Sequence, residues 1–321
     1  MPRWQSTSPD TLEVMPFSQQ FMDNPKADRV KRVASLRQAS VRRRLGLFLV
    51  EGPQAVREAV AYMPERVHDV YIDTSHNPHD DIISSALEAA NPIYLHHVST
   101  KVMEAISPDA QSIAAVVSSE GLIHTLDDID LNPLNTEFSE IGSTSSDNLE
   151  KNYQPQTELI VACWQARDPG NEGTLIRTAD ASGCRAIILV DDSAHPLNPK
   201  VVRSSAGSLF HIPVIQASTE EFFAWAEKHS LPIWAADIHG TQEHAPYDLV
   251  TVLADRNSEL VKPAATPIML FGNEARGLPT EIVERAGRAV MIPLYGCAES
   301  LNLAMSGAVM MYSIAMAQHQ G

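Results

Sequence analysis

The chain has 321 residues, of which 44% are hydrophobic and 20% charged, and its formal net charge is −16. No apolar run reaches the about 18 residues that a membrane-spanning helix needs, so the composition favours a soluble globular protein. The N-terminal residues lack the apolar core of a secretory signal, and the three cysteines are few and far apart. We therefore expect a cytoplasmic protein without a disulfide framework, a membrane anchor or a metal site.

The chain begins with a polar segment that is followed by a strongly basic one. Residues 1–24 contain scattered prolines and no sustained period, and we interpret them as a disordered tail. Between residues 26 and 44, eight Lys and Arg residues stand against a single acid, so this stretch is +7 and the remainder −23. The total charge argues against a nucleic-acid partner, but a local basic patch would supply cations for phosphate binding. A solvated helix face is the alternative. The candidate RNA-binding residues are Arg37, Arg42, Arg43 and Arg44.

Short β-branched runs and helical patterns alternate over residues 25–120, which is typical of a compact α/β domain. After a basic helix at about 28–40, we expect helices at 53–62 and about 80–90, and strands at 46–52, 67–73, 92–97 and 112–119. Residues 121–156 are acidic, rich in Ser and Asn, and long for a connection inside a domain. This segment is predicted to be a flexible linker.

The alternation resumes over residues 157–321, which we expect to form a second domain with its own core. Strands are predicted at 157–164, 186–190, 211–217, 231–237, 266–272 and 289–293, with helices at about 171–182, 199–207, 222–229, 279–286 and at the C-terminus. Because helices separate most successive strands, the sheet should be mostly parallel.

Polar stretches follow three strands of this second domain: DPGNEGTLIRTADASG (168–183), LFGNEARGLP (270–279) and IPLYGCAESLN (292–302). Each alone could be a helix cap or a turn. Together, their glycines and polar side chains predict a pocket at the ends of the strands, where open α/β sheets bind ligands. The stretches match neither G-x-G-x-x-G nor G-x-x-x-x-G-K-[ST], which disfavours dinucleotide and P-loop sites.

In this order, the stretches resemble the motifs of the SpoU (TrmH) family of RNA ribose 2′-O-methyltransferases, a branch of the SPOUT superfamily. The intervening VVRSSAGSLFHIPV is also similar to the family, so the resemblance covers nearly all of residues 157–318. The chain departs from the family pattern in following SLN with Leu303, Ala304 and Met305, and in its long linker. The first half resembles, with weaker motifs, the small α/β substrate-recognition domain often found in the family.

The resemblance implies a C-terminal α/β domain with a deep trefoil knot, a cleft for S-adenosylmethionine and a homodimer that acts on RNA. It implies a catalytic surface made of Asn171, Arg177, Glu274, Ser300 and Asn302. By position, the cofactor contacts would be Leu270, Gly272, Asn273, Gly277, Ile292 and Leu301.

Other functions remain open from the sequence. One is a non-catalytic RNA-binding or ribosome-assembly protein, another a methyltransferase that modifies a base nitrogen, and a third an α/β enzyme that binds an unrelated small anion. Ribosomal RNA is preferred to transfer RNA as the substrate, because an added recognition domain suits a large structured target.

Overall fold

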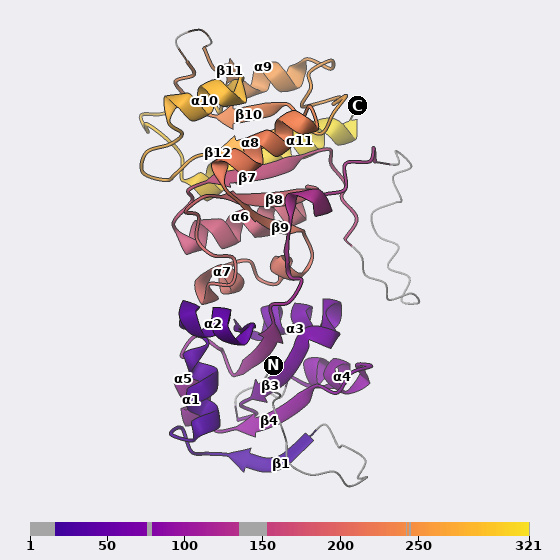
Figure 1. Cartoon of the computed structure of the whole chain (residues 1–321), viewed down its shortest axis with the longest axis vertical. Helices are drawn as coiled ribbons and strands as arrows, with labels where there is room; N and C mark the ends of the chain where they lie inside the picture. The colour runs from indigo at the N-terminus through magenta and orange to yellow at the C-terminus, as the bar shows by residue number, and fades with distance from the viewer. Residues whose placement is uncertain (1–16, 76–78, 135–152, 242, 244, 321) are drawn as a thin grey trace.

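The computed structural model describes residues 17–75, 79–134, 153–241, 243 and 245–320. Figure 1 shows two β-sheets stacked along the long axis, with helices packed around each. The α/β class and the mostly parallel sheet of the second half are confirmed, whereas the trefoil knot stays a prediction. Among the described residues, no helix is long and apolar enough to cross a membrane.

The first half forms a sheet of five strands in the order β1-β4-β3-β5-β2. Its strands are β1 (Phe17–Met22), β2 (Leu47–Glu51), β3 (Val67–Ile72), β4 (Tyr94–Val98) and β5 (Ile113–Ser118). Its helices are α1 (Asp28–Ser35), α2 (Ala39–Leu45), α3 (Pro53–Tyr62), α4 (Asp80–Glu88) and α5 (Thr100–Ile106). β5 runs antiparallel to β2 and β3, while β4 pairs in parallel with β1 and β3.

The second half forms a sheet of eight strands in the order β11-β13-β10-β12-β7-β8-β9-β6, paired in parallel throughout. The strands are β6 (Ile123–His124), β7 (Ile160–Trp164), β8 (Ala186–Val190), β9 (Val214–Ala217), β10 (Ile233–Ala236), β11 (Tyr247–Asp248), β12 (Ile268–Phe271) and β13 (Ala289–Met291). The helices are α6 (Pro169–Ala181), α7 (Pro199–Ser204), α8 (Thr219–Lys228), α9 (Leu249–Ala254), α10 (Thr280–Ala286) and α11 (Leu303–Gln320).

Both faces of this second sheet are covered by helices, as its fully buried strands require. Successive residues of β7 point to opposite faces: Val161 and Cys163 join the core under α6 and α11, whereas Ile160 and Ala162 join the core under α8 and α10. The result is a three-layer arrangement in which strand ends and helix starts meet at one edge of the sheet.

Each half has an apolar cluster of its own, but the predicted cores are not separate. One apolar cluster runs from β2 and α3 of the first half into β7, β8 and α6 of the second, and the rings of Phe48 and Phe210 lie 6.5 Å apart within it. Polar contacts add to this junction. His211 lies 2.9 Å from Asp180 and 3.3 Å from Glu58 of α3, while Arg203 of α7 pairs with Glu51 and Asp109 of the first half.

The chain between the sheets is more ordered than a flexible linker over the part that the structure describes. β6 lies at residues 123–124 and pairs with β9, which makes it an edge strand of the second sheet. The buried Arg185 side chain holds residues 130–132 in place. It donates hydrogen bonds to the carbonyl oxygens of Asp130 and Asn132 and to the Glu158 carboxylate. Residues 135–152 of the predicted linker lie outside the described residues.

Part of the predicted N-terminal tail is also a strand. β1 pairs in parallel with β4 at the edge of the first sheet, so the backbone of residues 17–22 finds hydrogen-bond partners there. Residues 1–16 lie outside the described residues. The predicted basic helix at 28–40 is divided into α1 and α2, and α5 at 100–106 is a helix that the sequence analysis missed.

Candidate active site

The first polar stretch forms the junction between β7 and α6. Asp168 is the N-cap of α6, since its Oδ1 accepts a hydrogen bond of 2.8 Å from the Asn171 amide. Pro169 follows at the first helical position, which its fixed φ suits. Gly173 lies where α6 crosses α7, and a Cβ there would collide with the Ser204 hydroxyl. The glycine therefore sets the close approach of the helices, while the N-cap sets where α6 begins.

The second stretch is a tight loop after β12. Asn273 and Gly277 exchange backbone hydrogen bonds, and Gly277 has a φ of +66°. A Cβ on Gly272 would collide with the backbone of Gly277 and Leu278, so glycine is required at that position. The Asn273 side-chain amide donates to the Gln165 carbonyl oxygen over 2.7 Å, which ties the loop to the end of β7.

The Glu274 carboxylate joins these two loops. It accepts hydrogen bonds from the backbone amides of Arg167 (3.2 Å) and Asp168 (3.1 Å) and from the Asn171 side chain (3.4 Å). Because β12 and β7 are neighbours in register, with Phe271 opposite Cys163, their following loops emerge at the same edge. The carboxylate thus holds the start of α6 against the loop after β12.

The third stretch brings Asn302 to the same place. Its Oδ1 accepts hydrogen bonds from the amides of Ala304 (2.9 Å) and Met305 (3.3 Å), as an N-cap of α11 does. Its Nδ2 donates to Asn171 Oδ1 over 3.1 Å. The side chains of Asn302, Asn171 and Glu274 therefore form one hydrogen-bonded row from three separate parts of the chain, as the sequence predicts.

A cavity of about 710 Å³ opens beside this row, at the carboxyl ends of β10, β12 and β13. The predicted residues that line it are Gly272, Asn273, Glu274, Gly277, Ile292, Ser300 and Leu301. Apolar groups from α11 and the preceding loop, including Leu294 and Met310, add to its wall. A cleft lined by glycine backbone, polar loop residues and apolar side chains suits a ligand that has both apolar and polar parts.

Other predicted site residues lie elsewhere. Leu270 is buried in the core under α8 and α10 and does not line the cavity, because the alternation of β12 directs Phe271 to it instead. Arg177 is exposed on α6, six residues or about 9 Å of helix beyond Asn171, and is not among the lining residues. Arg42 is 7% exposed and donates to the carbonyl oxygens of Leu36 and Arg37, so its guanidinium stabilises the turn between α1 and α2. Its predicted role in RNA binding is wrong.

A further part of the cavity lining was not predicted from the sequence. Asp237, Ile238 and His239 follow β10 and line it. Asp237 accepts hydrogen bonds of 2.7 Å from the amides of His239 and Gly240, which shapes the loop. The signal was a polar D-I-H-G run after a strand, as at the other three junctions.

Glu172 is a buried carboxyl group between these loops and the core. It is fully buried, and neither carboxyl oxygen makes a hydrogen bond of standard geometry with a described residue. Burial raises the pKa of Glu172 to about 9; the Ala194 backbone amide opposes this shift and the charge of Glu274 adds to it. Glu172 is therefore protonated at neutral pH.

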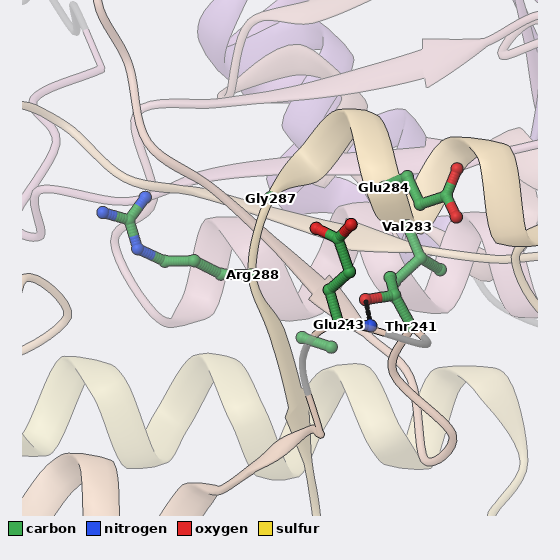
Figure 2. A pocket seen from close by; sticks show the side chains of 7 residues that line it. Thr241, Glu243, Val283, Glu284, Gly287 and Arg288 are labelled. Atoms are coloured by element: carbon green, nitrogen blue, oxygen red, sulfur yellow. Dashed lines mark hydrogen bonds between the residues drawn. The ribbon is translucent and has the colours of Figure 1, made fainter.

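A second cavity, of about 400 Å³, lies beside α10. Figure 2 shows its lining, in which the Glu243 amide bonds to the Thr241 hydroxyl and the Arg288 side chain points away from Glu243 and Glu284. None of the predicted site residues lines it. In the part of the chain that the structure describes, no group of three or more His, Cys, Asp or Glu side chains is arranged to hold a metal ion.

The buried Glu172 predicts an unusual pH dependence of stability. Its pKa is about 9 in the folded chain and about 4.5 when unfolded. At a pH between these two values, the folded chain binds a proton at Glu172 that is released on unfolding. This contribution is full below the unfolded pKa and is lost as pH rises through the folded pKa. Relative to Glu172→Gln, the wild-type free energy of unfolding should fall by about 1.4 kcal/mol per pH unit between pH 6 and 8.

Urea unfolding at several pH values measures this difference. Glu281→Gln, a change at an exposed position of α10, is the control and should follow the wild type. Parallel pH profiles for the wild type and Glu172→Gln would contradict the assignment of a buried, protonated carboxyl.

The family models match both halves of the chain. The SpoU rRNA Methylase family matches residues 158–312, and the MRM3-like substrate binding domain matches residues 27–115. The first of these ranges contains all three polar stretches.

Relatives and solved structures agree with these matches. The 23S rRNA (guanosine(2553)-2′-O)-methyltransferase RlmP of Bacillus subtilis is 33% identical over 148 residues, 46% of this chain and only about half, 54%, of that protein. An uncharacterised tRNA/rRNA methyltransferase of Synechocystis is 28% identical over 287 residues, 88% of this chain and 89% of the relative. The structure of an AdoMet-bound rRNA methyltransferase from Sinorhizobium meliloti superposes with a TM-score of 0.69 at 26% identity, covering 94% of this chain and 98% of that one.

The position of the motifs, the row of Asn302, Asn171 and Glu274, and these matches lead to one assignment. Residues 158–312 form a domain that matches the SpoU rRNA Methylase family, and they follow a segment that matches the MRM3-like substrate binding domain.

Proposed function

We propose that this chain is an S-adenosylmethionine-dependent RNA methyltransferase that methylates a ribose 2′-hydroxyl, in ribosomal RNA rather than transfer RNA. The observation that carries the proposal is the hydrogen-bonded row of Asn302, Asn171 and Glu274 at the rim of the cavity. The Bacillus relative acts on a ribose of 23S rRNA, as its name states, which supports the substrate class. Residues 25–120 would recognise the RNA and residues 157–321 carry out the transfer, in the cytoplasm.

The cavity fits the cofactor. Gly272 and Gly277 contribute backbone to its lining, Leu301, Leu294 and Ile292 contribute apolar side chains, and the loops contribute polar groups. The AdoMet-bound neighbour from Sinorhizobium meliloti supports the choice of ligand. When bound, S-adenosylmethionine supplies a methyl group that its sulfonium has already activated.

The residues of this chain then have to hold the ribose hydroxyl in line with the methyl carbon and exclude water. Glu274 and Asn302 fix the loops on either side of Asn171, so the three side chains present a rigid polar surface beside the cavity. Ser300 lines the cavity and would orient the ribose. A guanidinium stays protonated in proteins and is a poor base, so we assign Arg177 to an RNA phosphate, which its planar, charged fork suits.

A homodimer is part of the proposal. Met305, Val309, Tyr312 and Met316 are 52%, 42%, 42% and 53% exposed. Their spacing of four, three and four residues places them on one face of α11, while Met311 and Ile314 on the other face are buried. A continuous apolar stripe along the longest helix suits a second copy of the chain.

The transfer reaction is tested with Asn302→Asp. This change keeps the oxygen that caps α11, replaces the Nδ2 donor to Asn171 with an acceptor oxygen, and adds a negative charge to the row. Because misplacing a catalytic surface can cost about 100-fold in rate, we expect methyl transfer to fall by about that factor while S-adenosylmethionine affinity stays unchanged. The assay uses purified protein, labelled cofactor and total rRNA from cells that lack the gene.

The matched control is Asn257→Ala, at an exposed turn outside the three polar stretches. Resistance of the product to alkaline cleavage distinguishes ribose methylation from base methylation. A wild type that binds the cofactor but labels no RNA would favour a non-catalytic RNA-binding protein, and alkali-sensitive labelled RNA would favour a base methyltransferase.

The dimer is tested with the double change Met305→Asp and Val309→Asp. Charges placed in the apolar stripe of α11 should convert a dimer into a monomer, as measured by light scattering. Val250→Asp places a charge at another exposed apolar position, 60% exposed on α9, and should leave the dimer intact. A wild-type monomer at micromolar concentration would contradict the assignment.

A further inference from the structure

Three arginines near the start of the first half have exposed side chains: Arg37, Arg43 and Arg44. Among the described residues, no hydrogen bond or ion pair is formed by their guanidinium groups. They lie on α2 or in the turn just before it, and the buried Arg42 holds that turn in shape. These cations are therefore positioned by the fold and available to an external anion.

This basic surface lies at the junction with the catalytic half. In the view of Figure 1, α2 is drawn just below α7, and both α2 and α7 contact β2. Arg203 of α7 bridges to Glu51 and Asp109, which fixes the two halves relative to each other. Desolvation lowers the pKa of His195, and the charges of Arg42 and Arg43 lower it further, so the loop between β8 and α7 lies within reach of their fields.

The side chain of His195 is exposed, and even its neutral imidazole has an N–H group that can donate a hydrogen bond to a phosphate. Its Nδ1 accepts a hydrogen bond of 3.1 Å from the Leu197 amide. The neutral ring therefore carries its proton on Nε2, which is a hydrogen-bond donor. The lowered pKa of His195 does not remove this donor, because the neutral ring keeps the proton on Nε2.

Lys200 continues the path from His195 to the active site. Its Nζ lies 3.5 Å from Asp168 Oδ2, and the two side chains are 53% and 48% exposed. The Asp168 amide in turn donates a hydrogen bond to Glu274. Lys200 is therefore connected through the single residue Asp168 to the hydrogen-bonded row of Asn302, Asn171 and Glu274. An exposed ion pair of this kind contributes little, and Lys200 can exchange Asp168 for a phosphate. Of the other acids near this rim, Asp192 is paired with Arg167 and Glu274 is held by amides, while Asp237 and Glu299 line the cavity itself.

We propose that the RNA backbone crosses from the first half to the active site over Arg43, His195 and Lys200, and that Lys200 binds a phosphate beside the target ribose. This inference rests on the proposed function and adds residues of the catalytic half to the RNA site. Most of the chain is acidic, but these cations lie between the basic helix α2 and the start of α6. RNA bound at α2 could therefore reach the cleft along them.

The test measures RNA binding across a series of KCl concentrations, with the full-length protein and a uridine oligonucleotide or total rRNA as probes. Lys200→Ala and Arg43→Ala should each weaken binding and reduce the slope of log affinity against log salt by about 0.7, the value for one lost contact to a single strand. Lys200→Arg should restore both. Cofactor affinity should not change in any of them.

Lys228→Ala is the matched control, because Lys228 is also an exposed lysine paired with an aspartate, Asp127, but belongs to α8. It should behave as the wild type. Unchanged affinity and salt slope for Lys200→Ala, with a wild type that methylates RNA, would overturn this inference alone. A wild type that neither binds nor methylates RNA would overturn the proposed function, and this inference with it.

Discussion

The Glu274 carboxylate is the contact on which the geometry of the site depends. It binds the Arg167 and Asp168 amides at the start of α6, and it also accepts from Asn171, which holds Asn302 at the start of α11. The parallel pairing of β12 with β7 brings the loops to one edge, but pairing alone leaves their polar groups free to turn outward. A carboxylate that accepts hydrogen bonds from backbone amides fixes the loops that carry those amides, because charge-assisted hydrogen bonds are stronger than neutral ones.

The junction between the halves has a matching role for the substrate. A shared apolar core, the Arg203 ion pairs and the contacts of His211 hold the first sheet on the second. Under the proposed function, RNA bound by the first half would be held in a fixed position relative to the cleft in the second, which would lower the entropic cost of bringing the ribose to the site. A protonated Glu172 is buried next to the same loops. Burying a carboxyl group costs stability, and proteins commonly accept a cost of this kind at functional sites.

The sequence was most informative where a motif coincides with a strand-to-helix junction. β7, α6, β12 and α11 were predicted near their observed positions, and so was the meeting of Asn171, Glu274 and Asn302. Short elements were missed: α5 has seven residues and β6 two, too few for a period to be recognised. Arg42 was misread because charge in a basic run gives no sign that one guanidinium is used to bind backbone carbonyls. Leu270 was misplaced because a motif match does not say which face of β12 a side chain occupies.

The central claim is that this chain places a methyl group on one ribose in RNA. Mapping of 2′-O-methyl positions in total RNA tests it most directly, with three strains: wild type, one without the gene, and one that produces the Asn302→Asp protein. The account predicts a ribose mark in ribosomal RNA that is present in the wild type and lost from both other strains. Identical maps from all three strains, with the protein produced and folded, would contradict it.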